Sequence, residues 1–289
     1  MHACSYCYAR PSHEYLDFGA GTDFDRKIVI KSKAATLLRQ AFLKRSWKGE
    51  LILLSGNTDC YQPLEATYEL TRACLKVCAE FKNPIAVITK SALVERDADL
   101  LAQLAAEASC FVTMSIPFMN AEHCRQVEPF APTPERRLRT LRHLHEAGVP
   151  VGVNIAPIIP GLNDNDVPAI LEAAQQAGAT RAGYSLVRLP GAVNEVFEER
   201  IRAAFPLRAE RILHRIEDCR GGHRNEGRYG HRMSGTGRYW EAISTLFRTT
   251  AKRLGLDVTG RALPIQQRQE ESTFRRPGEG EQLALWPQD

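Results

Sequence analysis

Short β-branched runs alternate with longer amphipathic stretches along the first 200 residues of the chain. Parallel strands need helical crossovers between them, so this alternation predicts an α/β fold with a parallel sheet. We expect strands at Lys27–Ile30, Glu50–Leu54, Ile85–Thr89, Cys110–Ile116, Val149–Ile155 and Tyr184–Leu189. Helical spacing of apolar residues predicts helices at Leu64–Phe81, Ala92–Ala108, Pro134–Ala147, Asp166–Ala177 and Glu195–Ala204.

Repeated βα units of this kind fit a partial (β/α) TIM-type barrel of about six parallel strands with a C-terminal helical extension. A doubly wound sheet is the alternative architecture. We expect the barrel over residues 1–205 and a helical, Gly/Arg-rich extension over 206–260, with a charged helical stretch up to Cys219 and a helix at Tyr239–Leu254. Gln, Glu, Arg, Gly and Pro dominate residues 261–289, which predicts a disordered tail.

The composition is that of a globular protein, with 289 residues, 44% hydrophobic residues and a formal net charge of +4. No apolar run is long enough to span a bilayer, and the beginning of the chain lacks a secretory segment, so we expect a cytoplasmic protein. Disulfide frameworks belong to small secreted domains. The eight cysteines of this long chain therefore indicate metal or redox chemistry.

The sharpest local motif is the Cys-x-x-Cys pair formed by Cys4 and Cys7. Such a pair suits zinc, an iron–sulfur cluster or a dithiol redox site. No strand precedes Cys4, which disfavours a thioredoxin-like site. Zinc stays open as a minor alternative, with His2 and His13 as nearby candidate ligands.

The wider segment His2–Pro11 resembles the cluster segment of radical S-adenosylmethionine (radical SAM) proteins of the spore photoproduct lyase-like branch. The resemblance covers roughly the first 190 residues and extends more loosely beyond them. It continues through Ser55–Glu65, Thr89–Ser91, Ala156–Asp164 and Arg188–Pro190, and then Arg220–Gly222. Because these motifs occur in the order expected for that branch, a chance match at any one of them would not change the resemblance.

The resemblance implies a radical SAM enzyme that uses a [4Fe-4S] cluster to cleave S-adenosylmethionine and generate a 5′-deoxyadenosyl radical. A lyase reaction on the substrate is one expectation, and the substrate itself is not identified. A reductant protein such as a flavodoxin or ferredoxin is the implied electron donor. The rival interpretation is a cluster-less scaffold or nucleic-acid-binding barrel.

In the family, three cysteines spaced C-x3-C-x2-C hold the cluster. Cys4 and Cys7 match the second and third of them, so the first is expected immediately upstream of Met1, together with the first barrel strand. A start codon placed too late, or a fragment, explains the loss of both more simply than adaptive loss of the cluster. Translating the codons that precede Met1 tests this expectation.

The resemblance also implies which residues contact the cofactor. Tyr6 matches an aromatic position that packs near the adenine, and Ser115 and Asn154 are candidates for the ribose or carboxylate. The residues expected at the methionine end follow an apolar strand and are Ser55, Gly56, Asn57, Thr58 and Asp59. Ile159 and Gly161 match the adenine-flanking turn.

Two further groups are candidates for function. Cys60 and Tyr61 follow the same strand, where a thiol or phenol could donate hydrogen to a substrate radical. The segment Arg220–Trp240 holds five arginines, two histidines and six glycines against one acid, so it could grip the phosphates of DNA or another nucleic acid. A flexible connection or an internal lid is the alternative for that segment.

Overall fold

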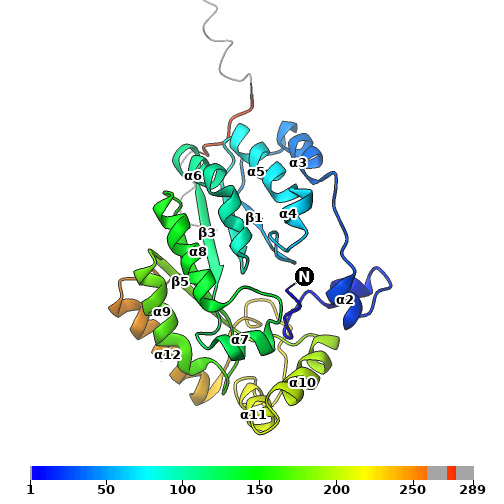
Figure 1. Cartoon of the computed structure of the whole chain (residues 1–289), viewed down its shortest axis with the longest axis vertical. Helices are drawn as coiled ribbons and strands as arrows, with labels where there is room; N and C mark the ends of the chain where they lie inside the picture. The colour runs from blue at the N-terminus through cyan, green and yellow to red at the C-terminus, as the bar shows by residue number, and fades with distance from the viewer. Residues whose placement is uncertain (1, 259–271, 278–289) are drawn as a thin grey trace, which may run out of the picture.

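The computed structural model describes residues 2–258 and 272–277. Its centre is one five-stranded sheet in which every neighbouring pair is parallel and the strands follow chain order (Figure 1). The strands are β1 (Ile52–Leu54), β2 (Ile85–Thr89), β3 (Cys110–Ser115), β4 (Val151–Ile158) and β5 (Arg181–Leu186).

The strand order distinguishes the two architectures that the sequence allowed. A doubly wound sheet reverses its order at a switch point, whereas here β1 to β5 follow one another without reversal. The sheet is unclosed, because β1 and β5 are its two edges. The partial (β/α) barrel is thus confirmed, with five strands in the described part of the chain rather than about six.

The strand expected at Lys27–Ile30 is absent, and this prediction was wrong. These residues form an extended connection between α2 (Thr22–Arg26) and α3 (Ala34–Leu43). Val29 is 52% exposed and Ile30 is 38% exposed, so neither contributes to the core. β-branched residues favour a strand only where a neighbouring strand and a buried face are present, and this segment has neither.

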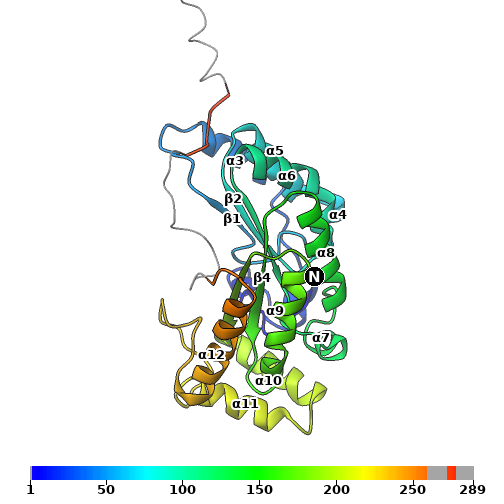
Figure 2. The ribbon, with the colours of Figure 1, turned by 90° about the vertical axis from the view of Figure 1, so that its left-hand side faces the viewer.

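Helices cover one face of the sheet (Figures 1 and 2). The helices predicted at Pro134–Ala147 and Asp166–Ala177 end within one residue of the expected position, and Gly148 and Gly178, which follow them, both adopt positive φ. The helix expected at Leu64–Phe81 is interrupted at Glu69, which is left-handed. Besides α2 and α3, the helices before β5 are α1 (Pro11–Glu14), α4 (Glu65–Tyr68), α5 (Leu70–Glu80), η1 (Ala92–Asp97), α6 (Ala98–Glu107), α7 (Ala121–Val127), α8 (Pro134–Glu146), η2 (Asp164–Asp166) and α9 (Val167–Gln176).

The extension after β5 contains α10 (Ala192–Ala204), α11 (Ala209–Asp218) and α12 (Gly237–Arg253). Helix α12 returns to the sheet and packs beside α9, as the two views of Figures 1 and 2 show. The rings of Tyr184 on β5 and Phe247 on α12 have their centroids 4.2 Å apart. The extension therefore shares the hydrophobic core of the barrel. No helix within 2–258 or 272–277 is both long and apolar enough to cross a membrane.

Residues 272–277 form a short clasp, although the sequence predicted a disordered tail from residue 261 onward. Phe274 is buried against Phe42 and Phe81, with ring centroids 5.7 and 6.0 Å away. Thr273 Oγ1 donates to the Lys82 carbonyl at 2.9 Å, and the Arg275 amide donates to the Phe81 carbonyl at 2.9 Å. The prediction fails for these six residues, and the rest of the predicted tail lies outside the described residues.

We expect Phe274→Ala to lower the free energy of unfolding by about 3 kcal/mol, because it removes a buried ring and leaves a cavity between two others. Urea denaturation followed by circular dichroism measures the change. Phe130→Ala is the matched control, since that ring is 69% exposed and its loss should cost little. Equal effects in the two variants would show that the clasp adds no stability.

Candidate cofactor site

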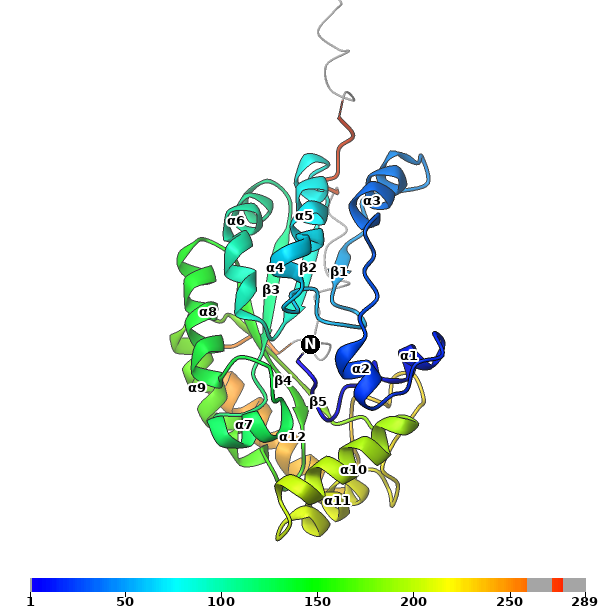
Figure 3. The ribbon, with the colours of Figure 1, turned by 45° about the vertical axis from the view of Figure 1, so that its right-hand side comes forward.

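Cys4 and Cys7 lie in one tight turn at the beginning of the chain, where the Cys7 amide donates to the Cys4 carbonyl at 3.3 Å. The buried side chain of Arg10 braces this turn by donating to the Cys4 carbonyl at 3.0 Å and to the Ala20 carbonyl at 2.7 Å. Figure 3 shows the beginning of the chain beside the carboxyl ends of the strands. The turn thus holds two thiols at the edge of the sheet where barrel enzymes carry out their chemistry.

A second set of contacts clamps the turn to the end of α7. The Ser5 amide donates to the Val127 carbonyl at 2.9 Å, and the Ser5 hydroxyl donates to the same oxygen at 3.1 Å. The Tyr6 hydroxyl donates to the Glu128 carboxylate, which also forms an ion pair with Arg137. Both members of that pair are completely buried. The position of Tyr6, directly before Cys7, therefore depends on a charge pair more than 120 residues away in sequence.

Arg137 links the clamp to the sheet itself. Its guanidinium donates to the Ser115 carbonyl at 3.0 Å and to the Pro132 carbonyl at 2.8 Å. Ser115 is the last residue of β3. Tyr6 is buried, with the ammonium of Lys90 5.7 Å from its ring centroid. The expected contact of Tyr6 with adenine stays a prediction, while its hydroxyl is already engaged.

The loop after β1 faces the cysteine turn. Ser55 has a φ of +81°, and its hydroxyl accepts a hydrogen bond from the Cys60 amide at 2.9 Å. The Tyr8 hydroxyl donates to the Gly56 carbonyl at 3.0 Å, and Asn57 donates to the Ser12 hydroxyl at 3.3 Å. The structure therefore brings this loop and the cysteine segment together. Gly56, Asn57 and Thr58 are exposed.

The carboxylate of Asp59 ties the ends of β1 and β2 together. One of its oxygens accepts the Tyr61 amide at 2.9 Å and the Thr89 hydroxyl at 2.8 Å, while the other accepts the Lys90 amide at 2.8 Å. The Nδ1 atom of His2 lies 3.5 Å from the second oxygen. Burial lowers the pKa of His2 to about 4, although Asp59 opposes this shift. With its oxygens engaged by the protein, Asp59 supports the loop rather than presenting a free group to a cofactor.

Ser115 and Asn154 are direct partners in the register of β3 and β4, so their side chains lie on the same face of the sheet. Both are buried. The neighbour of Asn154 on β5 is Gly183, which has no side chain to pair with it. The Oδ1 atom of Asn154 is buried without a hydrogen-bond partner among the described residues. An unpaired buried acceptor is costly, so this atom favours a ligand that donates a hydrogen bond.

Two buried side chains, the carboxamide of Asn163 and the carboxylate of Asp164, order the turn after β4. The Ile159 amide donates to the Asn163 side chain at 2.6 Å, and the Gly161 amide donates to Asp164 at 2.8 Å. Asn163 also donates to the Pro117 carbonyl at 2.6 Å, which joins this turn to the loop after β3. Gly161 has a φ of +80°, a conformation that strongly favours glycine.

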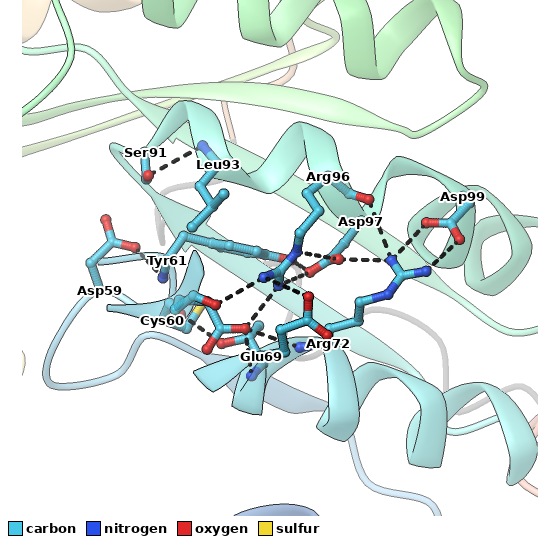
Figure 4. Close-up of polar contacts among 12 residues, drawn as sticks. Asp59, Cys60, Tyr61, Glu69, Arg72, Ser91, Leu93, Arg96, Asp97 and Asp99 are labelled. Atoms are coloured by element: carbon cyan, nitrogen blue, oxygen red, sulfur yellow. Dashed lines mark hydrogen bonds and ion pairs between the residues drawn. The ribbon is translucent and has the colours of Figure 1, made fainter. Parts of the chain in front are cut away.

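The two expected hydrogen donors have different surroundings (Figure 4). Tyr61 is completely buried, and its hydroxyl donates to Asp97 at 3.1 Å. Asp97 is itself buried and paired with Arg72 and Arg96. Cys60 is half-buried, and the burial of its thiol raises the thiol pKa well above the ordinary value. Tyr61 thus occupies a structural network, and the role of either residue as hydrogen donor stays a prediction.

The described residues supply two candidate sulfur ligands and do not complete a metal site. No group of three or more His, Cys, Asp or Glu side chains in 2–258 and 272–277 is arranged to hold a metal ion. His13 is engaged with the Lys27 carbonyl at 2.8 Å, so the zinc alternative finds no support here. Burial raises the thiol pKa of both Cys4 and Cys7, and metal binding must therefore displace their protons.

Some residues of this site had no local sequence signal. Glu128 and Arg137 look like ordinary helix-end and helix-surface residues in the sequence, and only their burial beneath the cysteine turn identifies them. Asn163 lies within Ala156–Asp164, one of the segments that resemble the family, and nothing in the residue itself marks its role. Lys90 likewise lies within Thr89–Ser91.

Comparisons with known proteins identify related sequences. The model of the Radical SAM superfamily matches residues 1–174. An uncharacterized protein of Mycobacterium tuberculosis is 36% identical over 207 residues, which are 71% of this chain and 61% of that protein. An uncharacterized protein of Methanocaldococcus jannaschii is 32% identical over 164 residues, which are 57% of this chain and 59% of that protein. The chain thus spans about three fifths of the length of these relatives.

Solved structures show the same fold. Mutants of spore photoproduct lyase, one of them with bound AdoMet and dinucleoside spore photoproduct, align with a TM-score of 0.56 at 14% sequence identity. The alignment covers 89% of this chain and 72% of the lyase chain. At this level of identity the likeness establishes the partial barrel and nothing about the substrate.

Proposed function

Because this chain belongs to the Radical SAM superfamily, we propose that it is an enzyme that cleaves S-adenosylmethionine with a [4Fe-4S] cluster. When bound and reduced, such a cluster supplies one electron to the sulfonium, so that a C–S bond breaks to give methionine and a 5′-deoxyadenosyl radical. Cys4 and Cys7 fit two of the three cysteine ligands, since one turn holds both thiols at the carboxyl edge of the sheet. The third ligand is not among the described residues.

The observation that carries this proposal is the unpaired Oδ1 atom of Asn154 at the same edge of the sheet as the cysteine turn. A ribose hydroxyl is a suitable donor to this atom, and the hydroxyl of Ser115 lies beside it on the next strand. Asn154 and Ser115 would thus hold the ribose of S-adenosylmethionine. The loop after β1 would border its methionine end.

The protein's own contribution to this proposed chemistry is orientation. The buried clamp formed by Tyr6, Glu128 and Arg137 holds the cysteine turn in one position. Asp59 holds the opposite loop, and Asn163 holds the turn after β4. Such supporting contacts keep reacting groups in a fixed geometry, which a reactive radical requires.

Asn154→Ala tests the cofactor site, and we expect it to weaken the affinity for S-adenosylmethionine about tenfold, the loss of one hydrogen bond. Its free energy of unfolding should change by only about 1 kcal/mol or less, because Oδ1 makes no hydrogen bond within the protein. Equilibrium dialysis with radiolabelled S-adenosylmethionine, before and after reconstitution with iron and sulfide, measures the affinity.

Thr113→Val is the matched control. Thr113 is buried on the same face of β3, two residues before Ser115 and therefore about 7 Å farther from the carboxyl edge. Its substitution should leave the affinity for S-adenosylmethionine unchanged. If Asn154→Ala binds S-adenosylmethionine as tightly as the unmodified protein, Asn154 does not contact the cofactor.

We also propose that a flavodoxin or ferredoxin delivers the electron, because cluster reduction needs a one-electron donor of low potential. For the substrate step we propose a lyase reaction. Product analysis by mass spectrometry, once a substrate is known, distinguishes cleavage of the substrate from simple hydrogen exchange.

A further inference from the structure

Three arginines gather just beyond the carboxyl end of β5. Arg188 is two residues past the last residue of that strand. The buried Arg220 donates to the Val187 carbonyl at 2.8 Å and to the Arg232 carbonyl at 3.1 Å. A further bond runs from Arg220 to the Ser234 carbonyl at 2.8 Å. Arg220 therefore holds the backbone next to Arg188 against the backbone of Arg232.

None of these three arginines forms an ion pair with a carboxylate within the described residues, although Glu226, which is paired with Arg228, acts to raise the pKa of Arg220. The neighbouring acids are engaged elsewhere, since Arg224 pairs with Glu198 and Glu217, and Arg228 pairs with Glu226. The Nε atoms of Arg188 and Arg220 are buried without a hydrogen-bond partner.

Burial and neighbouring like charges both disfavour the charged state of Arg188 and Arg220. Burial, and then Arg232, lowers the pKa of Arg188. Burial, and then Arg188, lowers the pKa of Arg220. Like charges in a partly buried group repel one another, and an anion bound among them offsets the repulsion.

The arginines lie beside the cysteine segment rather than on a remote surface. The guanidinium carbon of Arg188 is 5.3 Å from the centroid of the Tyr8 ring. Tyr8 follows Cys7 directly and donates to the Gly56 carbonyl in the loop after β1. An anion held by Arg188 would therefore lie at the same edge of the sheet as the two thiols, on the side of β5.

We propose that Arg188 and Arg232, braced by Arg220, bind a phosphate group of the substrate. Guanidinium groups match phosphate oxygens with paired hydrogen bonds, and a phosphate carries enough oxygens and charge to engage two of them. This identification of the bound molecule as a substrate rests on the proposed function, whereas phosphate binding itself does not. The phosphate can belong to a small phosphorylated molecule or to the backbone of a nucleic acid.

The S-adenosylmethionine carboxylate is the competing occupant, and the geometry argues against it. The candidate cofactor contacts are Ser115 on β3, Asn154 on β4 and the loop after β1. The arginines follow β5, the edge strand on the opposite side of the unclosed sheet from β1. The two sites are thus adjacent and separate.

The test is isothermal titration calorimetry on the chain without iron, using inorganic pyrophosphate and a short single-stranded DNA oligonucleotide as probes. We expect at least one probe to bind, and its dissociation constant to rise at least tenfold in Arg188→Gln and in Arg232→Gln. Arg188→Lys keeps the charge without the planar fork, so it should recover only part of the affinity. Tighter binding of the oligonucleotide identifies a nucleic-acid source, and tighter binding of pyrophosphate identifies a small molecule.

Arg211→Gln is the matched control, because Arg211 is an exposed arginine on α11 and its loss changes the net charge by the same amount. If Arg211→Gln weakens probe binding as much as Arg188→Gln does, the arginines attract the probe only through non-specific charge, and the proposal is overturned. Binding of neither probe, or loss of S-adenosylmethionine affinity in Arg188→Gln with no phosphate binding, would also overturn it. Phosphate binding without any cleavage of S-adenosylmethionine would instead remove only the proposed function.

Discussion

A cysteine placed immediately before Met1 is expected to convert a chain that holds iron poorly into one that binds about four iron ions, because it completes a three-thiolate cradle. The insertion restores the spacing C-x3-C-x2-C with Cys4 and Cys7 as the second and third ligands. The present chain offers two thiols in one turn and no third donor among the described residues. The missing thiolate is therefore the expected limit on iron binding.

Anaerobic reconstitution with iron and sulfide, followed by iron analysis and electron paramagnetic resonance of the reduced protein, measures this change. Formation of 5′-deoxyadenosine from S-adenosylmethionine should rise from background to a clear signal in the same sample. Cys4→Ser or Cys7→Ser, introduced with the added cysteine, should abolish both signals. Cys74→Ser is the control, because this partly buried cysteine lies on α5 and should leave the signals intact.

Two results would contradict the cluster assignment. One is full iron binding after Cys4 or Cys7 is replaced, which would remove these thiols from the site. The other is equal loss in Cys74→Ser, which would mean that replacing any cysteine disturbs the protein in a general way.

Glu128→Leu is expected to lower the free energy of unfolding by about 3–5 kcal/mol, because it leaves the charge of Arg137 buried without a partner. Both side chains are completely buried, so water cannot compensate for the loss. The substitution also removes the acceptor of the Tyr6 hydroxyl and so loosens the clamp on the cysteine turn. The thiol of Cys4, which is buried in the clamped turn, should then react faster with a thiol reagent.

Urea denaturation measures the stability, and the rate of Cys4 modification measures the clamp. The double variant Glu128→Leu with Arg137→Met removes both charges and should recover most of the stability. It does not restore the Tyr6 hydrogen bond, so Cys4 should remain more reactive than in the unmodified protein. Glu210→Leu, which breaks a surface ion pair with Arg202, should cost about 1 kcal/mol or less. A double variant no more stable than Glu128→Leu would show that the unpaired charge is not the cause.

The fold was predictable where local pattern and tertiary environment agree. β2 begins and ends at the predicted residues, because it is a central strand whose apolar run is almost entirely buried. Lys27–Ile30 has the same kind of composition and forms no strand, because no neighbouring strand pairs with it. In the clasp, Phe274 has a polar, low-complexity surrounding sequence, yet two distant aromatic side chains, Phe42 and Phe81, pack against it.

The candidate site was predictable in its motifs and less so in its supporting residues. Cys4, Cys7 and the loop from Ser55 to Asp59 could be identified by their sequence and its resemblance to a family, and the structure brings them together. Whether Asp59 faces a cofactor or the protein could not be predicted, because the answer depends on donors from β2. The same is true of Tyr61, whose hydroxyl reaches an aspartate 36 residues away.

The sequence by itself determined the properties that arise from neighbouring residues: the alternation of strands and helices, the glycine caps at Gly148 and Gly178, and the pairing of two thiols in one turn. Only the tertiary structure decided which polar groups are left unpaired and which are neutralised. It left the Oδ1 atom of Asn154 and the Nε atoms of Arg188 and Arg220 without hydrogen-bond partners among the described residues, and it buried Glu128 with Arg137. The physical reason is that the energy of a polar group depends on its burial and its partners, and both are supplied by segments far away in the chain.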